Sequence, residues 1–126
     1  MRGTLAAAAA LSLAAAAGCA SLRGQSAPAE YSGGVLVDQA KKMTLYTFDR
    51  DPRGRSACNG PCAASWPPFL AAAGGDAVVA GFTKVQRDDG ALQWAYKGKP
   101  LYFWSRDQKP GDRSGDGVDN LWRAAK

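Results

Sequence analysis

The sequence predicts a mostly β fold: a small antiparallel sheet domain built from two pseudo-symmetric repeats, with one short helical turn near a pair of cysteines. Three observations lead to this class. Short runs of β-forming residues lie between Gly-, Pro- and Asp-rich turns, and the chain aligns with itself at an offset of 56 residues. Only Pro61 to Trp66 predicts a helix, which Pro67 ends because proline cannot continue a helical hydrogen-bond ladder.

The strands follow from the β-forming runs and from the turns between them. Asp89-Gly90 is typical of a hairpin turn, so the runs on either side of it should pair antiparallel. Polar loops rich in Gly and Pro separate the later runs. In chain order, the expected strands are 34–38, 43–48, 82–87, 91–96, 101–105 and 120–124.

An internal repeat organises the folded part of the chain. We expect one domain at 33–126, divided into repeats 33–73 and 82–126. A repeat of about 45 residues cannot bury its own apolar face well, so the two copies should pack together about an approximate two-fold axis. Without a gap, the aligned pairs are Gly34 with Gly90, Leu45-Tyr46 with Leu101-Tyr102, Phe48 with Trp104, Asp51 with Asp107, and Trp66 with Trp122.

The repeated aromatic residues predict a shared core. Side chains alternate between the two faces of a strand, which places Tyr46 with Phe48 and Tyr102 with Trp104. We interpret these four rings as core, because large aromatic side chains dominate the cores of small domains. An exposed aromatic platform for a sugar or another flat ligand is the alternative.

The first 18 residues have the features of an export signal. After Arg2, Leu5 to Ala17 is an apolar run that is too short for a membrane span of about 20 residues but has the length of a signal-peptide core. The segment Ala16-Ala17-Gly18-Cys19 resembles the lipobox of bacterial lipoproteins, and this resemblance implies a lipid on Cys19 after cleavage. Ordinary cleavage near Ala20, with Cys19 discarded, is the alternative.

Residues 19–32 are rich in Ala, Ser and Pro and have no periodicity, which predicts a flexible tether between lipid and domain. Two or three acyl chains hold a protein firmly to a bilayer, so we expect the membrane to be a partner through the N-terminal lipid. Ala20 follows the cysteine. Because an Asp there resembles an inner-membrane retention signal, its absence favours the outer membrane, with the domain facing the periplasm.

Three cysteines in an exported chain leave one thiol without an intramolecular partner. Lipid attachment at Cys19 accounts for it and leaves Cys58 and Cys62, which can pair in an oxidising compartment. We expect a structural disulfide that fixes the loop before Trp66. Thiol exchange and copper(I) binding by the two thiolates stay open as alternatives.

Composition argues against most enzyme classes. The chain has no His, which excludes Ser-His and Cys-His catalysis and His-ligated metals. Asp112 to Asn120 is acidic and Gly-rich but lacks the ligand pattern of an EF-hand. The net charge of +5 is spread along the chain and predicts no nucleic-acid partner. We therefore expect no catalytic residues, no metal and no cofactor.

Two segments share the pattern Y-x-[FWY]-x-x-D: Tyr46 to Asp51 and Tyr102 to Asp107. Together with Cys58 to Pro68, Trp94 to Tyr102 and Gly111 to Gly117, they resemble a family of predicted bacterial lipoproteins that is also described as a secreted repeat of unknown function. The resemblance covers nearly all of 33–126 and implies no established activity. Each motif Asp ends a strand, where we expect its carboxylate to accept backbone N–H bonds from the following loop.

These observations predict an exported, envelope-anchored lipoprotein that acts as a non-catalytic binding or structural module. An envelope protein or a glycan is the expected partner. A small thiol-redox or copper-handling protein that uses Cys58 and Cys62 is the alternative, and titration of free thiols with and without copper would separate the two.

Overall fold

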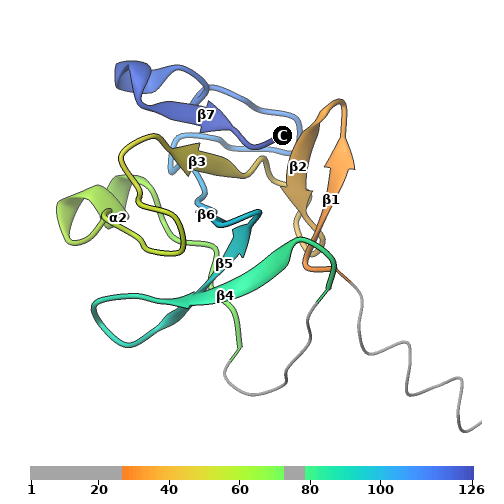
Figure 1. Ribbon diagram of the computed structural model, residues 1–126. Helices are drawn as coiled ribbons and strands as arrows, with labels where there is room; N and C mark the ends of the chain where they lie inside the picture. The colour runs from red at the N-terminus through yellow and green to blue at the C-terminus, as the bar shows by residue number, and fades with distance from the viewer. Residues whose placement is uncertain (1–26, 73–78) are drawn as a thin grey trace, which may run out of the picture.

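The folded region begins before the point that the sequence predicts. The computed structural model describes residues 27–72 and 79–126 (Figure 1). The predicted signal peptide at 1–18, the lipid attachment at Cys19 and the first part of the predicted tether lie outside these residues. Strand β1 (Ala29–Ser32) falls within 19–32, so the prediction of a tether is wrong for these four residues. Ala29 is buried and the β1 backbone pairs with β2 (Val35–Asp38), which orders a segment whose composition is typical of a linker.

Antiparallel pairing makes up the fold, as predicted. The first repeat contains the β1–β2 pair, and in the second repeat β4 (Phe82–Gln86), β5 (Leu92–Tyr96) and β6 (Lys99–Pro100) form a three-stranded meander. Strand β3 (Tyr46–Phe48) pairs with β7 (Trp122–Ala124), so this sheet joins the two repeats (Figure 1).

Two short helical turns lie at corresponding places in the repeats. The predicted turn is α2 (Pro61–Ser65), and a 3-10 turn, η2 (Val118–Asn120), precedes β7. Across residues 27–72 and 79–126, no helix has the length and apolar character that a bilayer crossing requires.

The strand predicted at 101–105 forms only isolated bridges. Tyr102 pairs with both Tyr46 and Pro68. Pro67 and Pro68 have no N–H to donate, so the segment opposite Tyr102 cannot complete a regular ladder. Strand β7 occupies the equivalent place in the other repeat, contains no proline and pairs regularly with β3.

Backbone bonds at equivalent residues show the predicted two-fold relation. The N–H of Tyr46 donates to the C=O of Tyr102 at 2.8 Å, and the N–H of Tyr102 donates to the C=O of Tyr46 at 2.9 Å. Because these residues are equivalent at an offset of 56, the two-fold axis passes between them. A further equivalent pair of bonds runs from Ala125 N–H to Leu45 C=O and from Phe69 N–H to Leu101 C=O, at 2.8 and 2.9 Å.

The predicted ungapped alignment is wrong at its N-terminal end. The C=O groups of Leu36 in β2 and Trp94 in β5 accept equivalent bonds, from Leu45 and Leu101 respectively, so β2 corresponds to β5 at an offset of 58. Gly34 and Gly90 are therefore not equivalent. The extra length lies in the turn after β2, where the carboxylate of Asp38 accepts two backbone N–H bonds and holds a wider turn.

Two core clusters lie on opposite faces of β3 and of the bridged segment at Tyr102. Tyr46 and Tyr102 belong to one cluster, together with Trp66 and Trp122. Leu45 and Leu101 point to the other face and belong to a cluster with residues of β2 and β4. Both faces of these strands are thus covered, and the alternation expected from the sequence is present.

Candidate functional site

Four aromatic rings form a continuous stack across the two-fold axis. Phe48 stacks on Trp122 with a centroid distance of 4.2 Å, Trp122 on Trp66 at 3.8 Å, and Trp66 on Trp104 at 3.9 Å. We call these four residues the ring stack. Its inner rings, Trp66 and Trp122, are buried and occupy equivalent places, while the outer rings are half-buried. The two repeats therefore bury their aromatic faces against each other.

The motif tyrosines cross from one repeat to the other. The hydroxyl of Tyr46 donates to Asp107 Oδ2 at 2.5 Å, and that of Tyr102 donates to Asp51 Oδ2 at 2.7 Å. Sequence reasoning missed these bonds because each Tyr and its partner Asp belong to different copies of the motif. Burial is the largest cause that raises the pKa of each tyrosine above its ordinary value, so both hydroxyls stay protonated and can donate.

The motif aspartates also fix the loops that follow them. The second oxygen of Asp51 accepts the N–H of Ala57 at 2.7 Å, and that of Asp107 accepts the N–H of Ser114 at 3.0 Å. Burial raises the pKa of the Asp51 carboxyl, although the N–H of Ala57 and the hydroxyl of Tyr102 oppose this shift. Each carboxylate thus joins a loop of its own repeat to a tyrosine of the other.

These contacts place the motif tyrosines in the core, whereas Phe48 and Trp104, which the sequence also predicts as core, are half-buried at the ends of the ring stack. Tyr46 and Tyr102 are fully buried, so the alternative of an exposed aromatic platform is wrong for both. The guanidinium carbon of Arg106 lies 5.8 Å from the ring centroid of Trp104, the last ring of the stack. The Y-x-[FWY]-x-x-D pattern therefore describes the junction between the repeats.

Cys58 and Cys62 form the predicted disulfide, with their sulfurs 2.07 Å apart. Cys58 is fully buried, and Cys62 lies in α2. At the same positions of the second repeat, Ser114 precedes the η2 turn and Val118 begins it, and neither can form a crosslink. The bonded sulfurs are not thiolates, the form that attacks disulfides or binds copper(I). Within the described ranges, no group of three or more His, Cys, Asp or Glu side chains could hold a metal ion.

A buried arginine that sequence reasoning did not single out supports the disulfide loop. Arg87 is 5% exposed, and its guanidinium donates to Ser56 Oγ, Gln93 Oε1 and the C=O of Cys58, at 3.0, 2.8 and 2.8 Å. Ser56 Oγ also lies 2.7 Å from the hydroxyl of Tyr102. A buried charge needs such partners, and this network connects β4 and β5 to the disulfide and the core.

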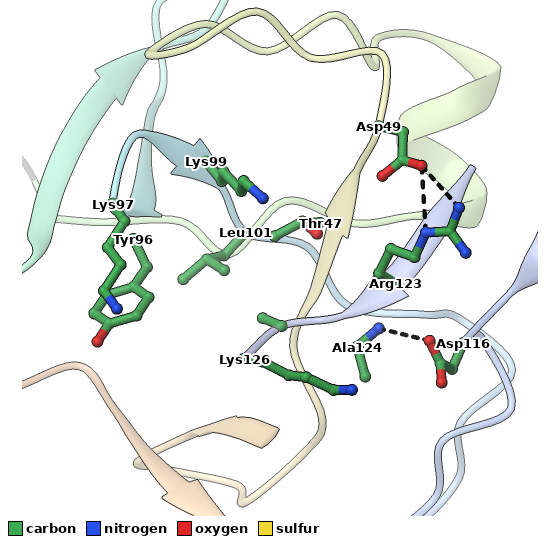
Figure 2. A pocket seen from close by; sticks show the side chains of 11 residues that line it. Thr47, Asp49, Tyr96, Lys97, Lys99, Leu101, Asp116, Arg123, Ala124 and Lys126 are labelled. Atoms are coloured by element: carbon green, nitrogen blue, oxygen red, sulfur yellow. Dashed lines mark hydrogen bonds and ion pairs between the residues drawn. The ribbon is translucent and has the colours of Figure 1, made fainter. Parts of the chain in front are cut away.

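A hollow with a volume of about 340 Å³ opens beside β3, β6 and β7 (Figure 2). Thr47, Leu101 and Ala125 are among the residues that line it, with Tyr96 at one side. Four cations also line it, from the β5–β6 turn, β6, β7 and the residues after β7: Lys97, Lys99, Arg123 and Lys126. We call this feature the cationic hollow.

The cationic hollow exists because the two repeats differ at equivalent positions. Thr47 and Ala125 correspond, at the 56-residue offset, to Phe103 and Phe69. Those two phenylalanines pack edge to face at a centroid distance of 5.4 Å and fill the same region of the other repeat. Small side chains thus replace two large rings. Cations replace apolar side chains at the rim, with Lys99, Arg123 and Lys126 at the positions of Met43, Pro67 and Leu70.

Both carboxylates that line the cationic hollow are already engaged. Asp49 forms an ion pair with Arg123 at 3.0 Å, and Asp116 accepts the N–H of Ala124 at 3.0 Å (Figure 2). Sequence reasoning missed this site because its cations come from two distant segments, 97–99 and 123–126, and look like a dispersed charge. The signal in the sequence is that equivalent positions of the two repeats differ in side-chain size and charge. A position-by-position comparison of the repeats would have shown it.

Comparison with known proteins assigns the chain to a family. No curated protein and no solved structure is a significant match. A family model described as a secreted repeat of unknown function matches residues 30–69 and 83–126, which together make up more than half of the chain. The two matched segments coincide with the two repeats of the fold. The chain therefore belongs to this family of secreted repeat proteins of unknown function.

Proposed function

We propose that this protein is a non-catalytic binding module of the cell envelope, and that the cationic hollow holds its ligand. A lipid on Cys19 anchors the chain to the outer membrane, and the folded region faces the periplasm. The family is secreted, which supports a location in the envelope or outside the cell. The lipobox-like Ala16-Ala17-Gly18-Cys19 supports the anchor.

The observation that carries this proposal is the difference between the repeats at the hollow. Thr47 and Ala125 stand where the other repeat has two packed phenylalanines, so one repeat gives up buried apolar volume. Filling that volume would stabilise a small domain, although by less than the roughly 1.5–3 kcal/mol of a fully buried side chain, because Phe69 and Phe103 are half-buried. A hollow that lowers the stability of the domain and is lined with cations is expected of a binding site.

The non-catalytic part of the proposal follows from the groups at the hollow. Asp49 and Asp116 are its carboxylates, and each already accepts a hydrogen bond from this chain. The chain has no His to act as a general base. The buried tyrosine hydroxyls donate to the motif aspartates of the core. Binding without chemistry is the role that this set of side chains supports.

The test is to fill the hollow with the residues of the other repeat. Thr47→Phe/Ala125→Phe copies the phenylalanine pair at the equivalent site, and a thermal melt checks that the variant folds; Thr47→Phe alone serves where the double variant does not, because Ala125 is buried. Soluble glycan fragments from the native envelope are passed over the immobilised full-length protein, and retained material is identified by mass spectrometry. The proposal predicts retention by the wild type and loss by the folded variant. Equal retention by both would contradict it.

The thiol-redox or copper-handling alternative has less support from the geometry. Cys58 is fully buried, so only Cys62 lies near enough to the surface for attack by an outside thiol. Alkylation of the protein as it is isolated from the envelope tests this alternative. Two free thiols at Cys58 and Cys62, or copper bound by them, would favour it over a structural crosslink.

A further inference from the structure

We infer that the cationic hollow selects an acidic sugar, a single ring that carries a carboxylate or a phosphate. This inference rests on the proposed function and names the class of ligand. Three properties of the hollow lead to it: an excess of positive charge, a fixed aromatic wall, and a volume that suits one ring.

The hollow carries an excess of positive charge. Arg123 is neutralised by its ion pair with Asp49. Lys97, Lys99 and Lys126 form no ion pair within residues 27–72 and 79–126. Asp116 is the other carboxylate of the lining, so the cations outnumber the anions there. A concave surface lined by one sign of charge concentrates its field and attracts ligands of the opposite sign.

One of these lysines occupies an unusual backbone conformation. Lys97 has φ 52° and Gly98 has φ 84°, so both central residues of the β5–β6 turn lie in the left-handed region. Such turns favour Asn, Asp or Gly at the first position, because a Cβ is strained there. The turn nevertheless places a lysine at the rim of the hollow, and backbone strain of this kind gathers at binding sites.

Tyr96 forms an aromatic wall whose position is fixed. Its hydroxyl accepts a hydrogen bond from Tyr31 at 3.2 Å, and its ring lies 4.7 Å from the ring of Phe82. Gly81 lies so close that a Cβ there would be 2.7 Å from the Tyr96 ring. The ring is therefore held in place, and Figure 2 shows it beside Lys97 at the hollow.

The excess of positive charge, the aromatic wall and the volume together fit a sugar ring that carries a carboxylate or a phosphate. The C–H face of a sugar packs on an aromatic wall, which Tyr96 provides. The acid pairs with lysine ammonium groups, which act as compact point charges for carboxylate and phosphate alike. The volume of about 340 Å³ is at the small end of the roughly 300–1,000 Å³ found for ligand sites, and it suits one ring.

The test is an NMR titration of the full-length protein in detergent at low ionic strength. The probes are glucuronate, glucose 6-phosphate and neutral glucose. We expect the two acids to shift the amide signals of Thr47, Leu101 and Ala125, and glucose to bind at least about tenfold more weakly. Preference for one acid over the other identifies the source of the negative charge as carboxylate or phosphate.

Two lysine variants complete the test. Lys97→Gln should weaken binding of the preferred acid about fivefold, and Lys99→Gln/Lys126→Gln about tenfold. Lys41→Gln is the matched control, because Lys41 lies in the corresponding turn of the first repeat and also lies over an aromatic ring, that of Phe103, at the filled site. Lys41→Gln should leave binding unchanged. Equal binding of glucose and the acids, or no effect of the hollow lysines, would overturn the inference.

Failure of this inference is distinguishable from failure of the proposed function. If the acids do not bind but Thr47→Phe/Ala125→Phe abolishes retention of envelope fragments, the hollow is the site and the ligand class is wrong. If the acids bind through the lysines but filling the hollow leaves retention unchanged, the charge selectivity stands and the proposed function is wrong.

Discussion

Removal of Trp122, an inner ring of the stack, should destabilise the protein more than removal of either outer ring. Trp122 is 2% exposed, stacks on Phe48 and Trp66 on its two faces, and receives the ring of Tyr102 at a centroid distance of 5.1 Å. Truncation of a buried Trp to Ala typically costs about 3–5 kcal/mol. A small domain is stable by roughly 5–15 kcal/mol, so Trp122→Ala should remove a large share of its stability.

The position of each ring in the stack predicts how much unfolding free energy its truncation removes. Trp104 packs on another ring through one face only, so Trp104→Ala should cost about 1.5–3 kcal/mol, less than Trp122→Ala. Trp66→Phe and Trp122→Phe are a matched pair, because the two residues are equivalent about the two-fold axis. Both keep an aromatic ring in the stack, so both should fold and cost similar amounts.

Urea unfolding followed by far-UV circular dichroism measures these free energies by linear extrapolation. The expected order is Trp122→Ala, then Trp104→Ala, with the two Trp→Phe variants close to each other. If Trp122→Ala lost less than about 1 kcal/mol, as exposed substitutions do, the stack would not hold the repeats together and the assignment of the motif to the core would be wrong.

Three further predictions concern separate features. Gly115→Ala should destabilise the protein in urea, because a Cβ there would lie 2.9 Å from atoms of both Trp104 and Trp66; an unchanged midpoint would contradict this packing. Burial raises the pKa of Asp51, so its contribution to stability is fully present below its ordinary pKa of 3.8 and is lost as the pH rises through the folded-state value. The unfolding free energy of the wild type relative to Asp51→Asn should therefore rise as the pH falls from 7 towards 4, and a constant difference would refute the shift. Cells grown with an alkyne fatty acid should label the wild type and not Cys19→Ser; a labelled variant would exclude Cys19 as the lipid site.

The repeat and its aromatic core could be predicted from the sequence because rare residue types recur at a fixed offset. Tyr46 with Tyr102 and Trp66 with Trp122 mark equivalent positions without any knowledge of the fold. The partners of these residues could not be predicted in the same way. A motif read within one repeat does not show that Tyr46 bonds to Asp107 of the other, since that depends on how the repeats pack.

Other features depend on tertiary contacts that local composition does not show. Ala29 to Ser32 has the composition of a linker but becomes a strand because β2 offers it backbone partners. The offset of β2 and β5 differs from that of the motif because the turn after Asp38 is longer. The cationic hollow is hidden because only the fold brings its two cationic segments, 97–99 and 123–126, to one surface.

The most direct test of the central claim is a map of amide shifts when envelope glycan fragments are added to the full-length protein. The account predicts shifts at Thr47, Leu101 and Ala125, which line the cationic hollow, and none at Phe103, which stands at the position of Thr47 in the other repeat. Shifts confined to Phe48 and Trp104, the outer rings of the stack, would contradict the account and place the ligand on an aromatic surface.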